Sequence, residues 1–327
     1  MNPPRLPRRA VHGVLLLDKP AGISSNAALQ QARRLLRAEK AGHTGTLDPL
    51  ASGLLPLAFG AATKFAQAGL DADKRYCATL RLGLRTPSGD AETEVVERRP
   101  VDVDRAAIDA VIARFTGPIE QRPPMHSALK HRGRALYDYA RAGIEVERSP
   151  RRIVVHRLEV LAWRSPELVL DVLCSKGTYV RALATDLGDA LGCGAMLAGL
   201  ERAAIGKLAL ARATTLAALA ALADDERDRL LLPPDALLAD WPAVRLAGDD
   251  AARFIAGLRR RVALPDAPAV RVYDDASDAF LGSGRLTAGE LIAERLLSPA
   301  EVRALQAAPA LARAQAVRAP RVPSECE

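Results

Sequence analysis

The chain is poor in cysteine and histidine, the residues that most often build disulfide frameworks and metal sites. Its four cysteines among 327 residues are Cys77, Cys174, Cys193 and Cys326, and no two of them form a C-x-x-C pair. This spacing indicates neither a disulfide framework nor a zinc site. The five histidines are scattered, so no metal-ligand cluster is visible. We expect no bound metal and a reducing, cytoplasmic environment.

Long apolar runs are also missing. The longest uncharged stretch covers residues 49–63 and contains proline, serine and glycine, which falls short of the ~20 apolar residues that span a bilayer. The first ten residues carry three arginines with no apolar segment behind them, so we expect neither a secretory signal nor a membrane partner. The sequence has no P-loop and no G-x-G-x-x-G after a strand, which disfavours a kinase or a dehydrogenase.

Basic residues are in excess, with 46 Lys and Arg against 39 Asp and Glu, a net charge of +7. Such a balance favours a polyanionic partner. The excess is concentrated in residues 121–152, where eight basic residues face three acidic ones, a local charge of 8 − 3 = +5. His126, Tyr137 and Tyr139 lie between these charges, as is typical of a surface that grips a nucleic-acid strand. The alternative is a solvated basic face.

Hydrophobic periodicity predicts a mixture of strands and helices. The expected strands lie at residues 14–17, 76–84, 154–161 and 168–174. The expected helices begin after caps at Ser24 or Ser25, at Asp104 and at Thr178. These elements do not alternate steadily as βαβ units. We therefore expect an α+β fold, with a mixed, largely antiparallel sheet flanked by helices.

Composition along the chain predicts three parts. Proline-rich sequence at residues 230–234 and 241–242 marks the end of a main domain, residues 1–242. Short apolar runs at 270–273 and 280–284 suggest a small β-rich module over 243–299. From residue 300 to 327 the Ala, Pro and Arg bias predicts a weakly ordered tail.

Two loops are candidates for chemistry. Asp48 lies before Pro49 in a glycine-rich loop, and proline restricts the backbone of the residue that precedes it. Residues 175–181 join a predicted strand to a predicted helix, a place where loops often carry function. Considered alone, an aspartate before proline such as Asp48 is typical of a turn. Arg181, considered alone, is typical of a solvated or salt-bridged surface residue.

Five motifs, taken together and in order, resemble those of the TruB family of tRNA pseudouridine-55 synthases. They are DKPAG at 18–22, GHTGTLDPLASG at 42–53, KRY at 74–76, QRPPMHSALK at 121–130 and SKGTYVR at 175–181. The resemblance covers roughly residues 11–215. It implies a pseudouridine synthase fold in the main domain, tRNA bound through its T arm, and neither a cofactor nor an obligatory protein partner.

The resemblance also assigns roles by position. Asp48 matches the catalytic aspartate, Arg181 the arginine paired with it, and Tyr76 the tyrosine that stacks on the flipped base. The remaining matched positions are the substrate contacts His43, Tyr179 and Leu200 and the supporting pair Lys19 and Pro20. Residues 200–206 depart from the family pattern, which lowers the expectation of RNA contacts there.

In the family, residues 121–152 resemble an inserted loop and helix that grips the T loop, with Lys130, Arg132 and Arg134 as candidate contacts. The C-terminal module resembles a small PUA-like RNA-binding module, and a purely structural cap is its alternative. Two other functions stay open: a guide-dependent RNA pseudouridine synthase, and a tRNA-folding factor with secondary catalysis. The sequence does not choose whether Asp48 attacks C1′, attacks C6 or removes a sugar proton.

Overall fold

The computed structural model describes residues 7–127 and 129–307, and its contacts divide them into two compact units. The first unit consists of residues 7–47, 54–71 and 206–307, and the second of residues 48–53 and 72–205. The division follows contacts and does not coincide with the predicted boundary at residue 242. Among the described helices, none is long and apolar enough to span a membrane.

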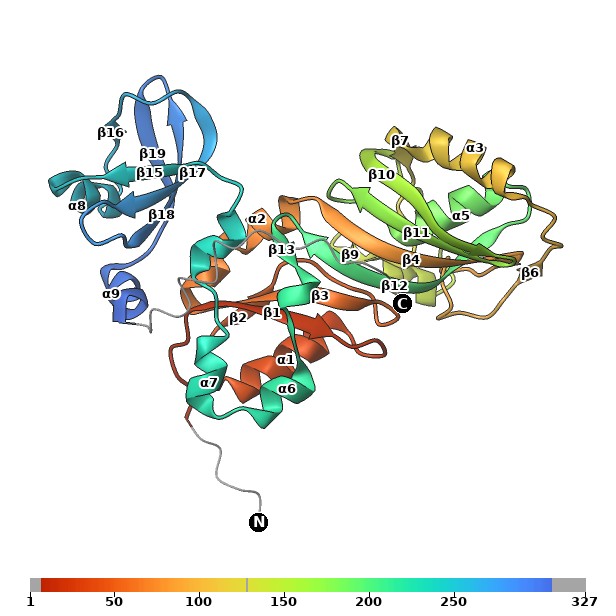
Figure 1. The fold of residues 1–327 in the computed structure, drawn as a ribbon, viewed down its shortest axis with the longest axis horizontal. Helices are drawn as coiled ribbons and strands as arrows, with labels where there is room; N and C mark the ends of the chain where they lie inside the picture. The colour runs from red at the N-terminus through yellow and green to blue at the C-terminus, as the bar shows by residue number, and fades with distance from the viewer. Residues whose placement is uncertain (1–6, 128, 308–327) are drawn as a thin grey trace, which may run out of the picture. The chain divides into compact units, whose positions relative to one another are not determined.

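The second unit is built on an antiparallel sheet with the strand order β12-β4-β11-β10-β7 (Figure 1). These strands are β12 (Ala195–Ile205), β4 (Lys74–Leu82), β11 (Glu167–Cys174), β10 (Arg151–Arg164) and β7 (Gly117–Gln121). Helix α5 (Val180–Ala190) packs on β12 and β4, and α3 (Arg105–Phe115) packs on β10 and on α5. The apolar positions of β4, among them Ala78 and Leu80, are buried as the alternation predicts.

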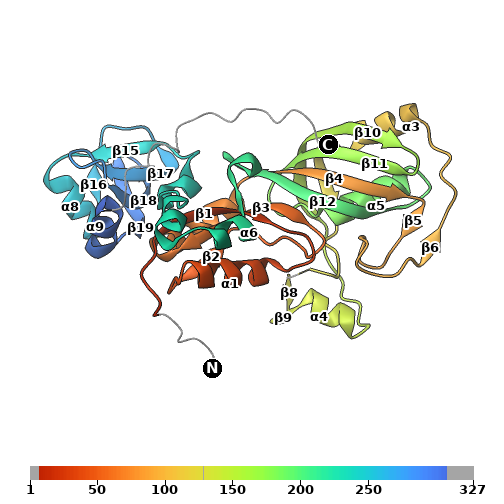
Figure 2. The ribbon, with the colours of Figure 1, turned by 60° about the horizontal axis from the view of Figure 1, so that its bottom comes forward.

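Two shorter pieces complete this unit. Strands β5 (Leu84–Arg85) and β6 (Glu97–Arg98) pair with each other. Between β7 and β10 the chain forms a hairpin of β8 (Lys130–His131) and β9 (Arg134–Ala135), followed by α4 (Leu136–Arg141). Figure 2 shows this hairpin and helix extending away from the sheet of their unit.

In the first unit, β1 (Gly13–Lys19) lies between β14 (Thr214–Thr215) and β3 (Ser52–Phe59), whose first two residues are counted with the second unit, and β2 (Ala41–His43) pairs with β3. Up to residue 242, the helical elements of this unit are α1 (Ser25–Leu35), η1 (Gly60–Phe65), α2 (Ala66–Asp71), η2 (Leu210–Arg212), α6 (Leu216–Ala221), α7 (Asp224–Arg229) and η3 (Pro234–Leu238), with β13 (Leu208–Ala209) before η2. The apolar run Leu15–Leu17 is buried within β1, as predicted for a buried strand.

The C-terminal part of the first unit is a five-stranded sheet with two helices. Its strands, in spatial order, are β15 (Ala243–Leu246), β17 (Ala267–Asp274), β18 (Phe280–Thr287), β19 (Glu290–Leu296) and β16 (Arg260–Arg261), and its helices are α8 (Asp249–Ile255) and α9 (Pro299–Ala307). The predicted β-rich module is thus confirmed. The predicted tail begins inside α9, because Val302 packs as a buried apolar residue there; residues 308–327 lie outside the described part.

The predicted α+β architecture is confirmed, and so are two of the three helix starts. The Ser24 hydroxyl accepts from the Ala27 N–H at 3.1 Å, and the Asp104 carboxylate accepts from the Ala107 N–H at 2.8 Å. The third cap, Thr178, was wrong. Tyr179 is the N-cap residue of α5, and the Thr178 hydroxyl donates instead to the Ser175 carbonyl at 2.9 Å.

Candidate active site

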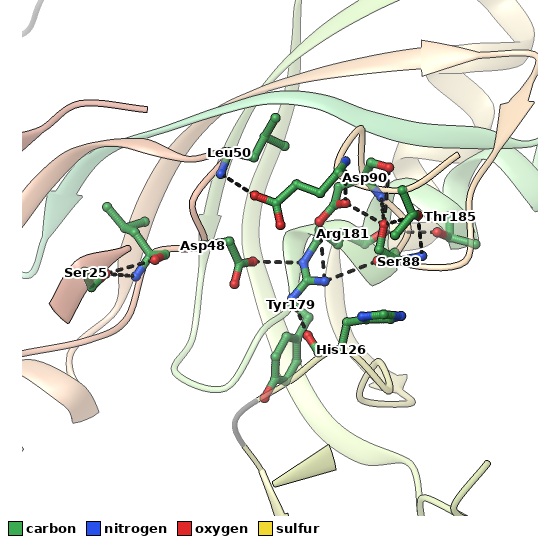
Figure 3. Close-up of polar contacts among 12 residues, drawn as sticks. Ser25, Asp48, Leu50, Ser88, Asp90, His126, Tyr179, Arg181 and Thr185 are labelled. Atoms are coloured by element: carbon green, nitrogen blue, oxygen red, sulfur yellow. Dashed lines mark hydrogen bonds and ion pairs between the residues drawn. The ribbon is translucent and has the colours of Figure 1, made fainter. Parts of the chain in front are cut away.

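Asp48 occupies a turn at the start of the second unit's sequence. The Ala51 N–H donates to the Asp48 carbonyl at 3.1 Å, which closes a four-residue turn with proline at its second position. The Asp48 side chain is 40% exposed, whereas that of Arg181 is only 7% exposed. Arg181 Nε lies 2.9 Å from Asp48 Oδ2 (Figure 3). The carboxylate is therefore reachable from solvent while its cationic partner is not.

The guanidinium of Arg181 is fixed on every side. Its Nη1 donates to the Ser88 carbonyl at 3.2 Å and lies 3.4 Å from Asp90 Oδ2, and its Nη2 donates to the His126 carbonyl at 2.7 Å. Asp90 is buried, and the Ser88 hydroxyl donates to it at 2.5 Å. A guanidinium held in this way presents a fixed positive charge to Asp48 and stabilises the ionised carboxylate.

Tyr76 lies on β4 and is almost fully buried. Its cross-strand partner on β12 is Arg202, which is 1% exposed and hydrogen-bonds to the Tyr76 side chain. Burial raises the pKa of Tyr76, and the charge of Arg202 opposes that shift. Burial also lowers the pKa of Arg202. The basic residue of the atypical segment 200–206 thus serves to hold the phenol of Tyr76.

Gln121 binds the backbone of Tyr179, the N-cap residue of α5. Its side chain is buried at the end of β7, and its amide accepts from the Tyr179 N–H at 2.8 Å and donates to the Tyr179 carbonyl at 3.1 Å. Both backbone groups of Tyr179 are bonded to this one side chain. The arrangement fixes the residue that precedes the helix that carries Arg181. Burial also raises the pKa of Tyr179.

Comparison with known proteins assigns the chain to a family. The model of the TruB family pseudouridylate synthase N-terminal domain matches residues 33–180, and that of the tRNA pseudouridylate synthase B C-terminal domain matches 181–239. A third, pseudouridine synthase II TruB C-terminal, matches 242–297. A tRNA pseudouridine synthase B of Cupriavidus pinatubonensis is 56% identical over 306 residues, covering 90% of this chain and 97% of that protein. The chain belongs to the TruB family.

Other relatives agree with this assignment. A tRNA pseudouridine synthase B of Burkholderia mallei is 55% identical over 301 residues, which is 90% of this chain and 96% of that protein. Among solved structures, a Cbf5-Nop10-Gar1 complex contains a chain that is 25% identical, with a TM-score of 0.71 over 89% of this chain and 87% of that chain. The archaeal box H/ACA sRNP Nop10-Cbf5 complex, 24% identical with a TM-score of 0.68 over 88% of this chain and 86% of that one, shares the fold.

The TruB motif residues divide between the two units. Asp48, Tyr76, Tyr179 and Arg181 belong to the second unit, and the charge of Asp48 acts on both tyrosines. Leu200, on β12 of the same unit, is half-buried opposite Ala78.

Lys19, Pro20 and His43 belong to the first unit. Lys19 is fully buried, and its ammonium donates to the carbonyls of Pro20 at 2.9 Å and Ile23 at 2.7 Å, which closes the turn after β1. His43 is half-buried and pairs with Leu57.

The basic segment carries its charges on the hairpin. Lys130, Arg132 and Arg134 are exposed. Arg132 and Gly133 form the two-residue turn with φ of 50° and 84°, the signs that a type I′ turn requires. The Arg134 guanidinium lies 4.8 Å from the centre of the Tyr139 ring and donates to the Asp138 carbonyl. Across the described residues, 7–127 and 129–307, no group of three or more His, Cys, Asp or Glu could hold a metal ion.

Sequence reasoning missed four residues of this site: Ser88, Asp90, Gln121 and Arg202. Ser88 and Asp90 lie in a Ser-Gly-Asp stretch that is typical of an exposed turn. Gln121 was inside a quoted motif, and its buried position at a strand end was not predicted. Arg202 was recognised only as part of an atypical segment, since a fully buried arginine is rare.

Proposed function

We propose that the protein isomerises uridine to pseudouridine at position 55, in the T loop of tRNA. The observation that carries the proposal is the half-exposed Asp48 carboxylate paired at 2.9 Å with a buried, fully bonded arginine. Membership of the TruB family supports the reaction class, and the names of the relatives support tRNA as the substrate. In this proposal Asp48 is the catalytic carboxylate and Arg181 holds it ionised and oriented.

The reaction needs no outside atom and no redox change. The N1–C1′ bond breaks, the uracil turns, and a C5–C1′ bond forms; C5 loses its proton and N1 gains one. Asp48 can attack C1′, attack C6 or remove a sugar proton, and each of these uses requires the ionised carboxylate. Arg181 supplies the fixed positive charge that favours that form.

The target base has to leave the stack, which costs a few kcal/mol. Stacking on an aromatic ring returns ~1 to 3 kcal/mol per base, so Tyr76 offsets much of this cost in our proposal. Arg202 keeps the Tyr76 ring in place from the neighbouring strand. Tyr179 and Leu200, in the same unit as Tyr76, contact the substrate in our proposal, and His43, Lys19 and Pro20 of the first unit keep the roles that the family motifs imply.

Binding of the T arm falls to the basic hairpin in this proposal, through the exposed Lys130, Arg132 and Arg134. Residues 1–242 form the catalytic domain, with 121–152 as its RNA-gripping insertion, and 243–299 form a PUA-like module. We propose that the protein acts in the cytoplasm on tRNA alone, without a cofactor or an obligatory protein partner.

The test uses the purified full chain and bare tRNA transcripts. Pseudouridine is mapped after incubation with a transcript that carries uridine at position 55 and with one that carries cytidine there. We expect modification at position 55 of the first transcript only, with an unchanged rate after treatment with excess EDTA. Modification elsewhere, or none, would overturn the assigned substrate.

A guide-dependent synthase is the second candidate, favoured by the fold similarity to chains in complexes that contain Nop10 and Gar1. The same experiment separates the two, because bare tRNA contains no guide RNA and no partner protein. A tRNA-folding factor with secondary catalysis is the third. It predicts that an inactive variant still accelerates tRNA folding, which a native-gel refolding assay measures.

A further inference from the structure

The turn that carries Asp48 has a second tether besides Arg181. Within residues 48–51, the Ala51 N–H closes the turn on the Asp48 carbonyl, and Pro49 has no N–H. The Leu50 N–H donates to Glu92 Oε1 at 2.8 Å. Figure 3 shows this bond beside the Asp48–Arg181 pair.

Glu92 is itself anchored to the charge network. Its N–H donates to Asp90 Oδ1 at 3.0 Å, and Asp90 Oδ2 lies 3.4 Å from Arg181 Nη1. Since Arg181 Nε contacts Asp48 Oδ2, the contacts form a closed ring. The ring holds the side chain of Asp48 through Arg181, and it holds the turn of Asp48 through the Leu50 N–H that Glu92 accepts.

We propose that Glu92 is a positioning residue for Asp48, which it orients by accepting the Leu50 N–H and so fixing the turn that carries the catalytic carboxylate. The inference rests on the proposed function. If only the carboxylate of Asp48 were held, the backbone of its turn could still move. A displacement of about 1 Å at a reacting group lowers the reaction rate strongly. The second tether removes that freedom without touching the substrate.

Two observations separate this role from support of the fold. Glu92 is exposed, and the turn is already closed by its own Ala51–Asp48 bond. Folding therefore does not depend on Glu92. Burial raises the pKa of Glu92, the bond from the Leu50 N–H opposes that shift, and the charges of Asp90 and Asp48 add to it. The Leu50 bond therefore favours the ionised form of the carboxylate that accepts it.

The test compares Glu92→Ala, which removes the acceptor, with Glu92→Gln, which keeps an acceptor oxygen and removes the charge. Single-turnover rates of pseudouridine formation are measured at saturating enzyme, with tRNA affinity and melting temperature measured alongside. Glu92→Ala should slow the reaction about fivefold to tenfold, which is less than the ~10²-fold that a full 1 Å misplacement can cost. Affinity and melting temperature should stay close to those of the unchanged protein.

Glu92→Gln should recover most of the lost rate, to within about twofold of the unchanged protein. Glu94→Ala is the matched control, because Glu94 is exposed and carries the same charge two residues along the loop; it should leave the rate unchanged. The inference is overturned if Glu92→Ala reacts at the original rate, or if Glu92→Gln is as slow as Glu92→Ala. Failure of the unchanged protein to modify tRNA would instead reject the proposed function.

Discussion

Arg181 and Arg132 present the same guanidinium in opposite settings within one unit. Arg181 is 7% exposed, and its nitrogens contact Asp48, Asp90 and two carbonyls. Arg132 is exposed at the tip of the β8–β9 turn. A guanidinium that is bonded on all sides cannot turn toward a phosphate without losing those bonds, whereas an exposed one can. Within this unit, the charge of Arg181 is fixed against Asp48, whereas the charge of Arg132 is available to a partner.

The base of the basic segment, residues 121–152, contacts the buried site. Gln121 and His126 both lie in residues 121–152, and they contact Tyr179 and Arg181 respectively. His126 was predicted to lie among the charges of a strand-gripping surface, and its backbone carbonyl accepts from Arg181 Nη2. The tip of the segment therefore carries the exposed charges, and its base contacts the site.

The role of the buried Arg181 and its partner is tested most strongly by Asp48→Asn. This change removes the negative charge opposite Arg181 while keeping the shape of the side chain, so we expect the single-turnover rate to fall by ~10⁴-fold or more and tRNA affinity to change little. Asp109→Asn, at an exposed ion pair on α3, is the control and should react normally. Substantial activity in Asp48→Asn would mean that another group carries the chemistry.

The exposed arginines of the β8–β9 hairpin are tested by combining Arg132→Asn with Arg134→Gln. Asparagine tolerates the positive φ at position 132, so the turn should persist. Each neutralised phosphate contributes about 0.7 to 0.9 to the slope of log affinity against log salt, and the double change should flatten that slope by roughly 1 to 2. The rate on bound tRNA should change much less.

Binding titrations at four salt concentrations measure this slope. Arg105→Gln removes one charge from the exposed surface of α3 and provides the comparison. An unaltered slope in the double variant would assign the hairpin to a solvated face and place the RNA-binding surface elsewhere.

Asp186, on the same helix as Arg181, gives the smallest expected effect. Burial, and then the charge of Asp189, raise its pKa to about 6 from an ordinary value of 3.8. The folded protein therefore binds the proton of the Asp186 carboxyl more tightly than the unfolded chain does. Ionised Asp186 destabilises the folded protein, and this destabilisation is absent below pH 3.8 and complete above about pH 6. Asp186→Asn should raise stability at pH 8 by about 1 kcal/mol after allowance for solvent screening.

The gain for Asp186→Asn should shrink as the pH falls through 6 toward 4, which melting curves at pH 4, 6 and 8 would show. Asp109→Asn again provides the control. An equal gain at all three pH values would attribute the effect to packing, with no contribution from the charge.

Local interactions were predictable from the sequence, and long-range ones were not. Ser24 and Asp104 cap their helices through N–H groups three residues away, so the pattern alone identified them. The start of α5 was mispredicted: its N-cap residue, Tyr179, makes no side-chain cap bond, and the Thr178 hydroxyl donates to the Ser175 carbonyl. Gln121, which binds the backbone of Tyr179, lies 58 residues away in the chain, and the sequence offered no sign of this long-range contact.

The proposed catalytic pair, Asp48 and Arg181, was predicted from family motifs, whereas the residues that contact it were not. Asp90 has the local sequence of an exposed turn, yet it is buried, because its loop pairs with Leu197 of β12 and its carboxylate lies 3.4 Å from Arg181 Nη1 of α5. Arg202 becomes buried because the β12–β4 register places it opposite Tyr76. Such roles arise from strand pairing, which a single sequence does not encode in any local pattern.

Gly53 is constrained by its close contact with the strand that carries Arg202. It pairs with Arg202 on the neighbouring strand at a φ of 96°, and a Cβ there would lie 2.6 Å from the Arg202 carbonyl oxygen and 2.8 Å from its nitrogen. No L-amino acid with a side chain fits that space without moving the strand that supports Tyr76. A change at this position, five residues after Asp48, would therefore act through Arg202 on Tyr76, although Gly53 has no side chain with which to contact a substrate.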